Sequence, residues 1–486
     1  MPLATIQVRE VGRVQEIRKD IARVTGLSRC MNGELLEFSP RAKGMVMGFD
    51  ERAAFVFLLG RVDEVKVGSQ AFSKMEPFSI SVGEGFCGRI VNALGEPIDR
   101  KGPIAASTKY PVFRDAPGVL ERRPIKRTFH TGLLTIDSTI PIGKGQRELI
   151  IGDRMTGKTT VGVDSILNQK GKGVVCVYCC IGRSYSSLRN IVEILKFNDA
   201  LDYTVVMAGT AANCSGEQYL APYSAAAIGE YFMDRGQDVF VVFDDLTKHA
   251  WAYRQLSLLL ERPPGRECYP GDIFYVHSQL MERAGQYDDE HGGGSMTFFP
   301  IVDTLQGDVT GYIPSNLVSM TDGQIYMSSN LFNSGFRPAI DLGLSVSRIG
   351  SKVQSKAMRE LSGMLRLEYV QHNELLKKTR FTAGVSEEMQ ARLRPGEVLT
   401  QLFTQDANDP YPLAKHLLLL FAHREKLLEP QSHDEIERFK SDFYPFAKEN
   451  YPEALATLDE TLEFSPDLRK SCKEAVKAFF AEGGEE

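Results

Sequence analysis

The sequence lacks any apolar run of the ~20 residues that a membrane-spanning helix needs. Residues 1–20, MPLATIQVREVGRVQEIRKD, contain no apolar signal core, and their acidic side chains are atypical of a transit peptide. We therefore expect a protein of the cytoplasm, or one that lies on the cytoplasmic side of a larger assembly.

A basic excess is also missing, since 57 lysines and arginines stand against 63 aspartates and glutamates, for a formal net charge of −6. Nucleic-acid-binding proteins usually carry a strong basic excess, so we expect no nucleic-acid partner. Of the eight cysteines, only Cys176, Cys179 and Cys180 lie close together in the sequence. The sequence has no second ligand pair at metal-binding spacing. These thiols are expected to be small apolar residues on a buried strand.

The 486 residues exceed one ordinary domain and divide by pattern into three. Residues 1–71 contain short β-like segments separated by turn signals, which indicates a small barrel or sandwich. Within residues 72–351, apolar runs alternate with helical stretches, which is typical of a parallel sheet covered on both faces. Residues 352–486 read as amphipathic helices. The strands expected in the central region are 148–152, 173–182, 203–209, 238–246, 271–278 and 296–304.

The sharpest motif is GDRMTGKT at residues 152–159, a full G-x-x-x-x-G-K-[ST] pattern that we call the phosphate loop. It follows the strand-like run ELIIG and opens a helical stretch. Glycine lets backbone N–H groups turn toward phosphate oxygens, and the start of the helix adds its positive end. Lys158 supplies a mobile charge and Thr159 a hydroxyl for Mg²⁺. The motif therefore predicts nucleotide binding.

An acidic residue at the end of a neighbouring strand would complete such a site. The run DVFVVFDDL ends in Asp244 and Asp245, and Asp244 is predicted to hold Mg²⁺ directly or through water. The alternative is a strand that simply ends in solvated aspartates. The upstream phosphate loop favours the metal-binding interpretation.

With these motifs the sequence resembles the alpha subunits of F-type ATP synthases, from about residue 8 to about residue 425. The most specific stretches are PIGKGQRELIIGDRMTGKTT, DDLTKHAWAYRQLSLLLERPPGRECYPGDIFYVHSQLMERA and RPAIDLGLSVSRIGS. The resemblance implies a β-barrel, a RecA-like P-loop NTPase domain and a C-terminal α-helical bundle. It also implies ATP or ADP with Mg²⁺ as ligands, and alternation with catalytic beta-type subunits in a hexamer around a gamma-type shaft. Membrane contact and proton or sodium ion transport would come only through that complex, on the cytoplasmic face.

Two positions depart from the family pattern. Hydrolysis needs a group that orients the attacking water. Beta subunits carry a Glu for this just after the strand that follows the phosphate loop, alpha subunits usually carry a Gln, and this chain has Arg183. Arginine cannot act as a base, so Arg183 is expected to hold the γ-phosphate without turnover, or else to point away and pair with an acid. Met155 stands where alpha subunits usually carry Gln, which implies altered nucleotide affinity.

The resemblance assigns catalytic weight to Arg348, in LSVSRIGS. Its family counterpart is an arginine finger that reaches into the neighbouring beta subunit's site and stabilises charge on the transferred phosphoryl group. Ser319 matches a second residue near that interface. The residues expected to contact nucleotide are Gly152, Asp153, Arg154, Met155, Thr156, Gly157, Lys158, Thr159, Thr160, Arg183, Asp244, Phe332, Arg337, Pro338 and Gln405.

Family members normally carry about one more helix before the first barrel strand, and that helix binds the peripheral stalk. Here the barrel begins almost at once, so a different stator docking is expected, as in a divergent rotary complex. Two other functions stay open. A self-sufficient hexameric export-type ATPase would need its own water-orienting Glu, and a Rho-type helicase would need a basic, aromatic-rich RNA-binding domain.

Overall fold

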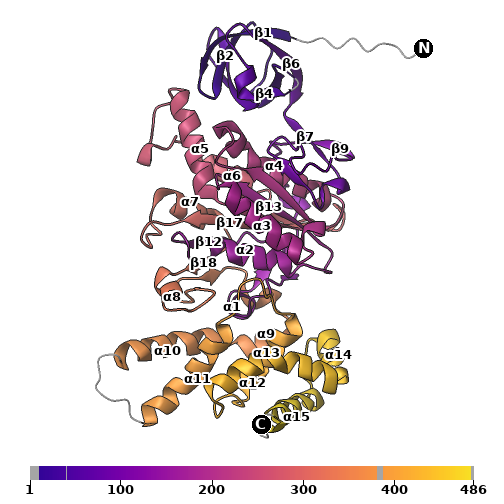
Figure 1. Ribbon diagram of the computed structural model, residues 1–486, viewed down its shortest axis with the longest axis vertical. Coiled ribbons are helices and arrows are strands. Elements are labelled where there is room, and N and C mark those ends of the chain that lie inside the picture. The colour runs from indigo at the N-terminus through magenta and orange to yellow at the C-terminus, as the bar shows by residue number, and fades with distance from the viewer. Residues whose placement is uncertain (1–9, 40, 380–386, 483–486) are drawn as a thin grey trace, which may run out of the picture.

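Six antiparallel strands close into a barrel at one end of the molecule (Figure 1). Their order around the barrel is β1-β2-β5-β4-β3-β6, and β6 pairs with β1 to complete the circle. Alternating side chains such as Val24, Leu36 and Val56 fill the interior. The strands are β1 (Glu10–Arg18), β2 (Ile21–Thr25), β3 (Glu34–Glu37), β4 (Ala42–Phe49), β5 (Ala53–Gly60) and β6 (Gln70–Pro77).

The computed structural model describes residues 10–39, 41–379 and 387–482. In the central domain, six parallel pairings join seven strands in the order β18-β12-β17-β15-β13-β14-β8, with β19 and β16 added antiparallel. Their bounds are β8 (Ile90–Asn92), β12 (Leu149–Gly152), β13 (Val174–Ile181), β14 (Thr204–Gly209), β15 (Asp238–Asp244), β16 (Gly285–Gln286), β17 (Ser295–Asp303), β18 (Gly323–Met327) and β19 (Val346–Ser347). The strands are buried on both faces, as their near-continuous apolar runs predict.

Helices cover both faces of this sheet, and two short antiparallel pairs flank it. The helices are α1 (Leu134–Thr139), α2 (Lys158–Leu167), α3 (Tyr185–Phe197), α4 (Ser215–Met233), α5 (Leu246–Leu259), α6 (Ile273–Met281), α7 (Tyr312–Met320) and α8 (Ser329–Asn333). The pairs are β7 (Ser79–Val82) with β9 (Thr108–Pro111), and β10 (Thr128–Phe129) with β11 (Ile142–Gly143). Short 3-10 helices are η1 (Val62–Glu64), η2 (Glu84–Phe86), η3 (Val119–Glu121), η4 (Leu201–Tyr203), η5 (Arg266–Cys268) and η6 (Gly350–Val353).

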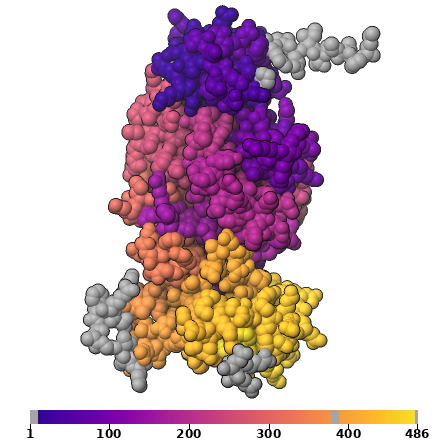
Figure 2. Space-filling model, viewed as in Figure 1, coloured from indigo at the N-terminus to yellow at the C-terminus, as the bar shows by residue number. Residues whose placement is uncertain are grey.

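Seven helices follow at the far end of the molecule from the barrel, so the three domains are stacked along its long axis (Figures 1 and 2). They are α9 (Lys356–Ser362), α10 (Leu365–Thr379), α11 (Glu387–Phe403), α12 (Leu413–Arg424), α13 (His433–Asn450), α14 (Pro452–Thr461) and α15 (Pro466–Glu482). Helix α12 is buried along almost its whole length and forms the centre of this domain. In the described part of the chain, no helix is both long and apolar enough to span a membrane.

The sequence analysis was wrong about residues 271–278, which were expected to form a strand. The segment forms helix α6 instead. Its buried residues Ile273, Val276, His277 and Leu280 recur at helical spacing, and the pattern continues beyond the expected segment to Met281. A short apolar run does not distinguish the two periodicities by itself. The domain limits 1–71, 72–351 and 352–486 stay a prediction, and strand β6 runs across the first of them.

Helix α13 begins at a capping box, and we expect a local stability cost when it is removed. The Ser432 hydroxyl accepts from the Glu435 N–H at 3.3 Å, and the Glu435 carboxylate accepts from the Ser432 N–H at 2.6 Å. Replacing Ser432 by Ala should lower the free energy of opening of this first turn by about 1 kcal/mol. Native-state hydrogen exchange measures it, with mid-helix Ser441→Ala as the control. Equal effects from both variants would argue against capping.

Candidate functional site

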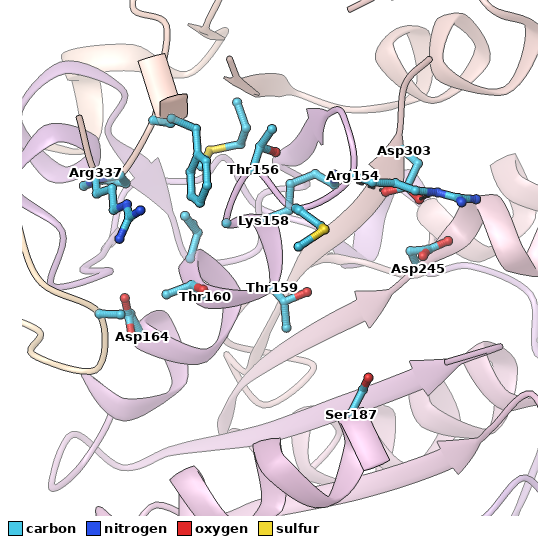
Figure 3. Close-up of a pocket in the computed structure, with 18 of the residues that line it drawn as sticks. Arg154, Thr156, Lys158, Thr159, Thr160, Asp164, Ser187, Asp245, Asp303 and Arg337 are labelled. Atoms are coloured by element: carbon cyan, nitrogen blue, oxygen red, sulfur yellow. Dashed lines mark hydrogen bonds and ion pairs between the residues drawn. The ribbon is translucent and has the colours of Figure 1, made fainter. Parts of the chain in front are cut away.

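A cavity of about 690 Å³ opens at the carboxyl ends of the central parallel strands. Strand β12 delivers the phosphate loop to it, β13 leads to Arg183, and β15 and β17 end at Asp244 and Asp303. Figure 3 shows Arg337 on one side of the phosphate loop and Asp303 on the other. The predicted residues that line the cavity are Arg154, Met155, Thr156, Gly157, Lys158, Thr159, Thr160, Arg183, Phe332, Arg337, Pro338 and Gln405.

The phosphate loop ends at Gly157, which has a φ of 94° and precedes the first residue of helix α2. Only glycine adopts this backbone conformation freely, which explains its place in the motif. The helix therefore starts at the cavity wall with its first N–H groups and its positive end facing the open space. Met155, at a φ of 63°, is 89% exposed, so its side chain covers little of the cavity.

Lys158 is buried and held in place inside the phosphate loop. Its Nζ donates to the carbonyls of Gly152, at 2.8 Å, and of Asp153. It also lies 3.1 Å from Oδ1 of Asp303, which Arg154 approaches at 3.2 Å from the opposite side. A cation held at the floor of the loop is already placed to meet a phosphate group.

Asp244 lies under the cavity floor, fully buried. Its Oδ2 accepts from the Thr159 hydroxyl at 2.8 Å and from the Tyr178 hydroxyl at 2.7 Å. Its Oδ1 receives no hydrogen bond from the described residues but lies 3.0 Å from Nε of Arg183. The arginine is thus in the cavity wall and paired with an acid, and its contact with a γ-phosphate stays a prediction.

Two further carboxylic acids that face the cavity are only partly ionised at neutral pH. Burial, with the charges of Asp244 and Asp303, raises the pKa of Asp245 to about 7. Burial and nearby Asp409 raise the pKa of Asp164 to about 7. Asp245 also caps helix α5 by accepting from the Lys248 N–H at 2.8 Å.

Comparisons with known proteins agree with this geometry. Two family models described as "ATP synthase alpha/beta family" match the chain, the beta-barrel domain at residues 7–71 and the nucleotide-binding domain at residues 132–347. A third, "ATP synthase alpha/beta chain, C terminal domain", matches residues 354–479. The chain is 46% identical over 475 residues to ATP synthase subunit alpha of Clostridium acetobutylicum, covering 97% of this chain and 94% of that protein. It is 44% identical over 474 residues to the same subunit of Clostridium botulinum strain Hall, covering 98% and 94%.

The chain belongs to the ATP synthase alpha/beta family. The family and the succession of barrel, nucleotide-binding domain and helical domain, both predicted from sequence, are thereby confirmed.

Gly152, Asp153 and Asp244, although predicted to contact nucleotide, do not line the cavity. Gly152 ends strand β12, where Met327 packs too closely to admit a Cβ. The Asp153 carboxylate accepts from the Thr304 hydroxyl at 2.6 Å, the Gly307 N–H at 2.8 Å and the Ser329 hydroxyl at 2.9 Å. Burial alone would raise the pKa of Asp153, but these hydrogen bonds lower it. Asp153 therefore ties neighbouring loops to the phosphate loop.

The side of the cavity assigned to adenine combines two domains. Arg337 lies over the ring of Phe332, with its Cζ 4.8 Å from the centroid. Gln405 is buried, and its amide donates to the carbonyls of Gly132, at 2.9 Å, and Asp409, at 2.7 Å. Its Oε1 accepts from the Leu134 N–H at 3.2 Å. With its amide engaged in this way, Gln405 shapes the wall and offers little to a base.

Arg348 and Ser319 lie outside the cavity, on the exposed surface, and close to each other. An Nη2 of Arg348 approaches the carbonyl of Val318 at 3.5 Å. Among the described residues, no carboxylate lies within ion-pair distance of this guanidinium. Glu148 is near, but burial raises its pKa well above the ordinary value even though the charge of Arg348 opposes the shift. Because it is exposed and has no ion-pair partner among the described residues, the guanidinium is available to another molecule.

Sequence reasoning missed Asp303, Asp164, Lys248 and Asp245 as cavity residues. A signal existed for Asp303, because it ends the apolar run MTFFPIVD just as Asp244 ends DVFVVFD. The parallel register then places Asp303 beside Gly152, at the start of the phosphate loop. Asp164 had no such signal, since its position depends on the docking of the helical domain, whose Asn408 N–H donates to it at 2.9 Å.

Proposed function

We propose that the chain is the non-catalytic, nucleotide-binding alpha-type subunit of a rotary ATP synthase. It binds ATP or ADP in the cavity and presents Arg348 to the catalytic site of a neighbouring beta-type subunit. In an alternating hexamer around a gamma-type shaft, it would couple synthesis or hydrolysis to rotation and to proton or sodium ion transport. The complex would place it on the cytoplasmic face of a membrane.

The observation that carries the non-catalytic assignment is Arg183. It stands at the position where a catalytic subunit would need a carboxylate, and its positive charge is directed to Asp244 at 3.0 Å. A guanidinium stays protonated at any relevant pH, so it cannot accept a proton from water. Three other carboxylates of the cavity are engaged: Asp303 with Lys158 and Arg154, Asp245 with the start of helix α5, and Asp164 with the Asn408 N–H.

The side-chain oxygens at and just below the cavity floor are of the chemical type that Mg²⁺ prefers as ligands. The Thr159 hydroxyl and the Asp244 carboxylate lie 2.8 Å apart, and hydroxyl and carboxylate oxygens suit this hard cation. We propose that these two residues hold it, where it would neutralise phosphate charge. Lys158, Arg154 and the first N–H groups of helix α2 would bind and orient the phosphates.

The isolated chain should bind ATP but hydrolyse it far below the ~10 s⁻¹ that is the typical enzyme median. The physical reason is the absence of a group at position 183 that can orient or deprotonate water. Calorimetric titration measures binding, and a coupled ATPase assay measures turnover on the same preparation. Asp245→Asn is the informative control, because Asp245 lines the cavity next to Asp244 and its raised pKa would let it act as a base. Fast turnover that Asp245→Asn abolishes would favour a self-sufficient ATPase.

A further inference from the structure

The ion pair between Arg183 and Asp244 occupies the place where a nucleotide's metal ion would meet this protein. Arg183 lines the cavity and its side chain is 27% exposed, while Asp244 lies beneath the cavity floor and is fully buried. Oδ2 of Asp244 is already used by two hydroxyl donors. Its Oδ1 has no hydrogen bond from the described residues and faces only the guanidinium. The one Asp244 oxygen left for a cation therefore already has a positive charge beside it.

The other carboxylates around the cavity floor offer a divalent cation little. Asp303 lies 3.1 Å from Lys158 and 3.2 Å from Arg154, so two cations share its charge. Asp245 is buried, and its carboxylate already accepts from the Lys248 N–H at 2.8 Å at the start of helix α5. Across the described residues, no group of three or more His, Cys, Asp or Glu side chains could hold a metal ion.

We propose that Arg183 is a tethered counter-cation that supplies positive charge to the phosphates when Mg²⁺ is absent, so that this site accepts metal-free ATP or ADP about as well as the magnesium complex, in which Thr159 and Asp244 would hold the metal. The inference rests on the proposed nucleotide-binding function. A guanidinium is permanently charged and offers several N–H donors, so it can remain paired with Asp244 through Nε while its terminal nitrogens meet phosphate oxygens. A magnesium ion would have to approach a carboxylate that Arg183 already neutralises, against the repulsion of the arginine.

A purely structural ion pair would behave differently. If Arg183 only fixed the loop after β13, its loss would change the nucleotide affinity in the same ratio with or without magnesium. The counter-cation role instead predicts that Arg183 sets the dependence on magnesium itself. The ratio of the two dissociation constants for one nucleotide, measured in EDTA and in excess Mg²⁺, separates the two roles.

Calorimetric titration of the full-length chain with ADP measures this ratio without any turnover. The wild-type dissociation constant in EDTA should lie within about threefold of that in Mg²⁺. Arg183→Gln should bind ADP at least about tenfold more weakly in EDTA than in Mg²⁺, because a charge-assisted phosphate contact is lost and Asp244 is freed for the metal. Arg189→Gln is the matched control, since it removes an arginine from the exposed face of α3, where it pairs with Glu193, and should keep the wild-type ratio.

A wild-type ratio of about tenfold or more in favour of Mg²⁺, or an unchanged ratio in Arg183→Gln, would overturn the inference while leaving the proposed nucleotide binding intact. No binding of ADP in either buffer would overturn both. If Arg183→Gln does not fold, thermal unfolding of the wild type, with Arg183→Lys for comparison, still tests the counter-cation role. ADP in EDTA should raise the melting temperature of the wild type nearly as much as ADP with Mg²⁺, and a rise only with Mg²⁺ would contradict the counter-cation role.

Discussion

Replacing Arg348 by Ala should lower the multisite ATPase turnover of the reconstituted ring by about 10³-fold or more, the range that arginine fingers supply. The affinity of this subunit's own cavity for nucleotide should stay nearly unchanged. The reason is geometric: Arg348 is exposed, lies outside its own cavity, and is placed beside Val318 and Ser319 on the surface. Among the described residues, its guanidinium has no carboxylate partner, so it can contact a neighbouring subunit without breaking an ion pair.

The assay is steady-state turnover of the assembled complex, with assembly checked by gel filtration. Arg348→Lys should rescue poorly, because a flexible point charge does not reproduce the planar fork of the guanidinium. Arg189→Ala serves as the control for loss of an exposed arginine. It should lower the free energy of unfolding by at most about 1 kcal/mol and leave turnover unchanged. Near-wild-type turnover in a fully assembled Arg348→Ala ring would refute the cross-subunit role.

Replacing Lys158 by Ala should weaken ADP binding in this subunit's cavity by about 10- to 100-fold, the loss expected for one hydrogen bond to a charged group. The side chain is buried, and its Nζ is already fixed at the loop carbonyls and 3.1 Å from Asp303. Its removal takes away a preplaced positive charge and leaves Asp303 with Arg154 alone. Turnover at the partner's catalytic sites should change less than affinity does here.

Nucleotide titration of the variant and of Lys170→Ala gives the comparison. Lys170 lies just after the end of helix α2, which Lys158 begins, but it is exposed and pairs with Asp199 on the surface. The Lys170→Ala variant should bind ADP with the affinity of the wild type. Unchanged affinity in Lys158→Ala would mean that the lysine does not meet phosphate and that the loop has another role.

The sequence predicted best the features that a short stretch of chain determines. The phosphate loop, Gly157 and the start of helix α2 depend on local backbone chemistry, and they occur where the motif placed them. The strand predicted over residues 271–278 was wrong because a short apolar run fits both the helical and the strand periodicity. The buried residues Leu280 and Met281, which continue the helical pattern, lie outside that segment.

The relations between distant segments could not be predicted. Arg183 meets Asp244 because parallel strands β13 and β15 run in a register that sets Cys180 beside Asp244. Gln405 is part of the cavity wall because, where the helical domain packs on the central domain, its amide hydrogen-bonds to the backbone of Gly132 and Leu134. Sequence spacing alone carries no information about either arrangement.

The cavity wall that Gln405, Asp406 and Ala407 share with the phosphate loop has a mechanical consequence. A nucleotide bound there bridges the sheet domain and the helical domain, so twisting one against the other must distort or release the ligand. Saturating the site at 100 times its dissociation constant stabilises the joined arrangement by about 2.7 kcal/mol. Occupancy would therefore make the subunit torsionally stiffer across that joint without any chemical step, a suitable property for the static wall of a motor under torque.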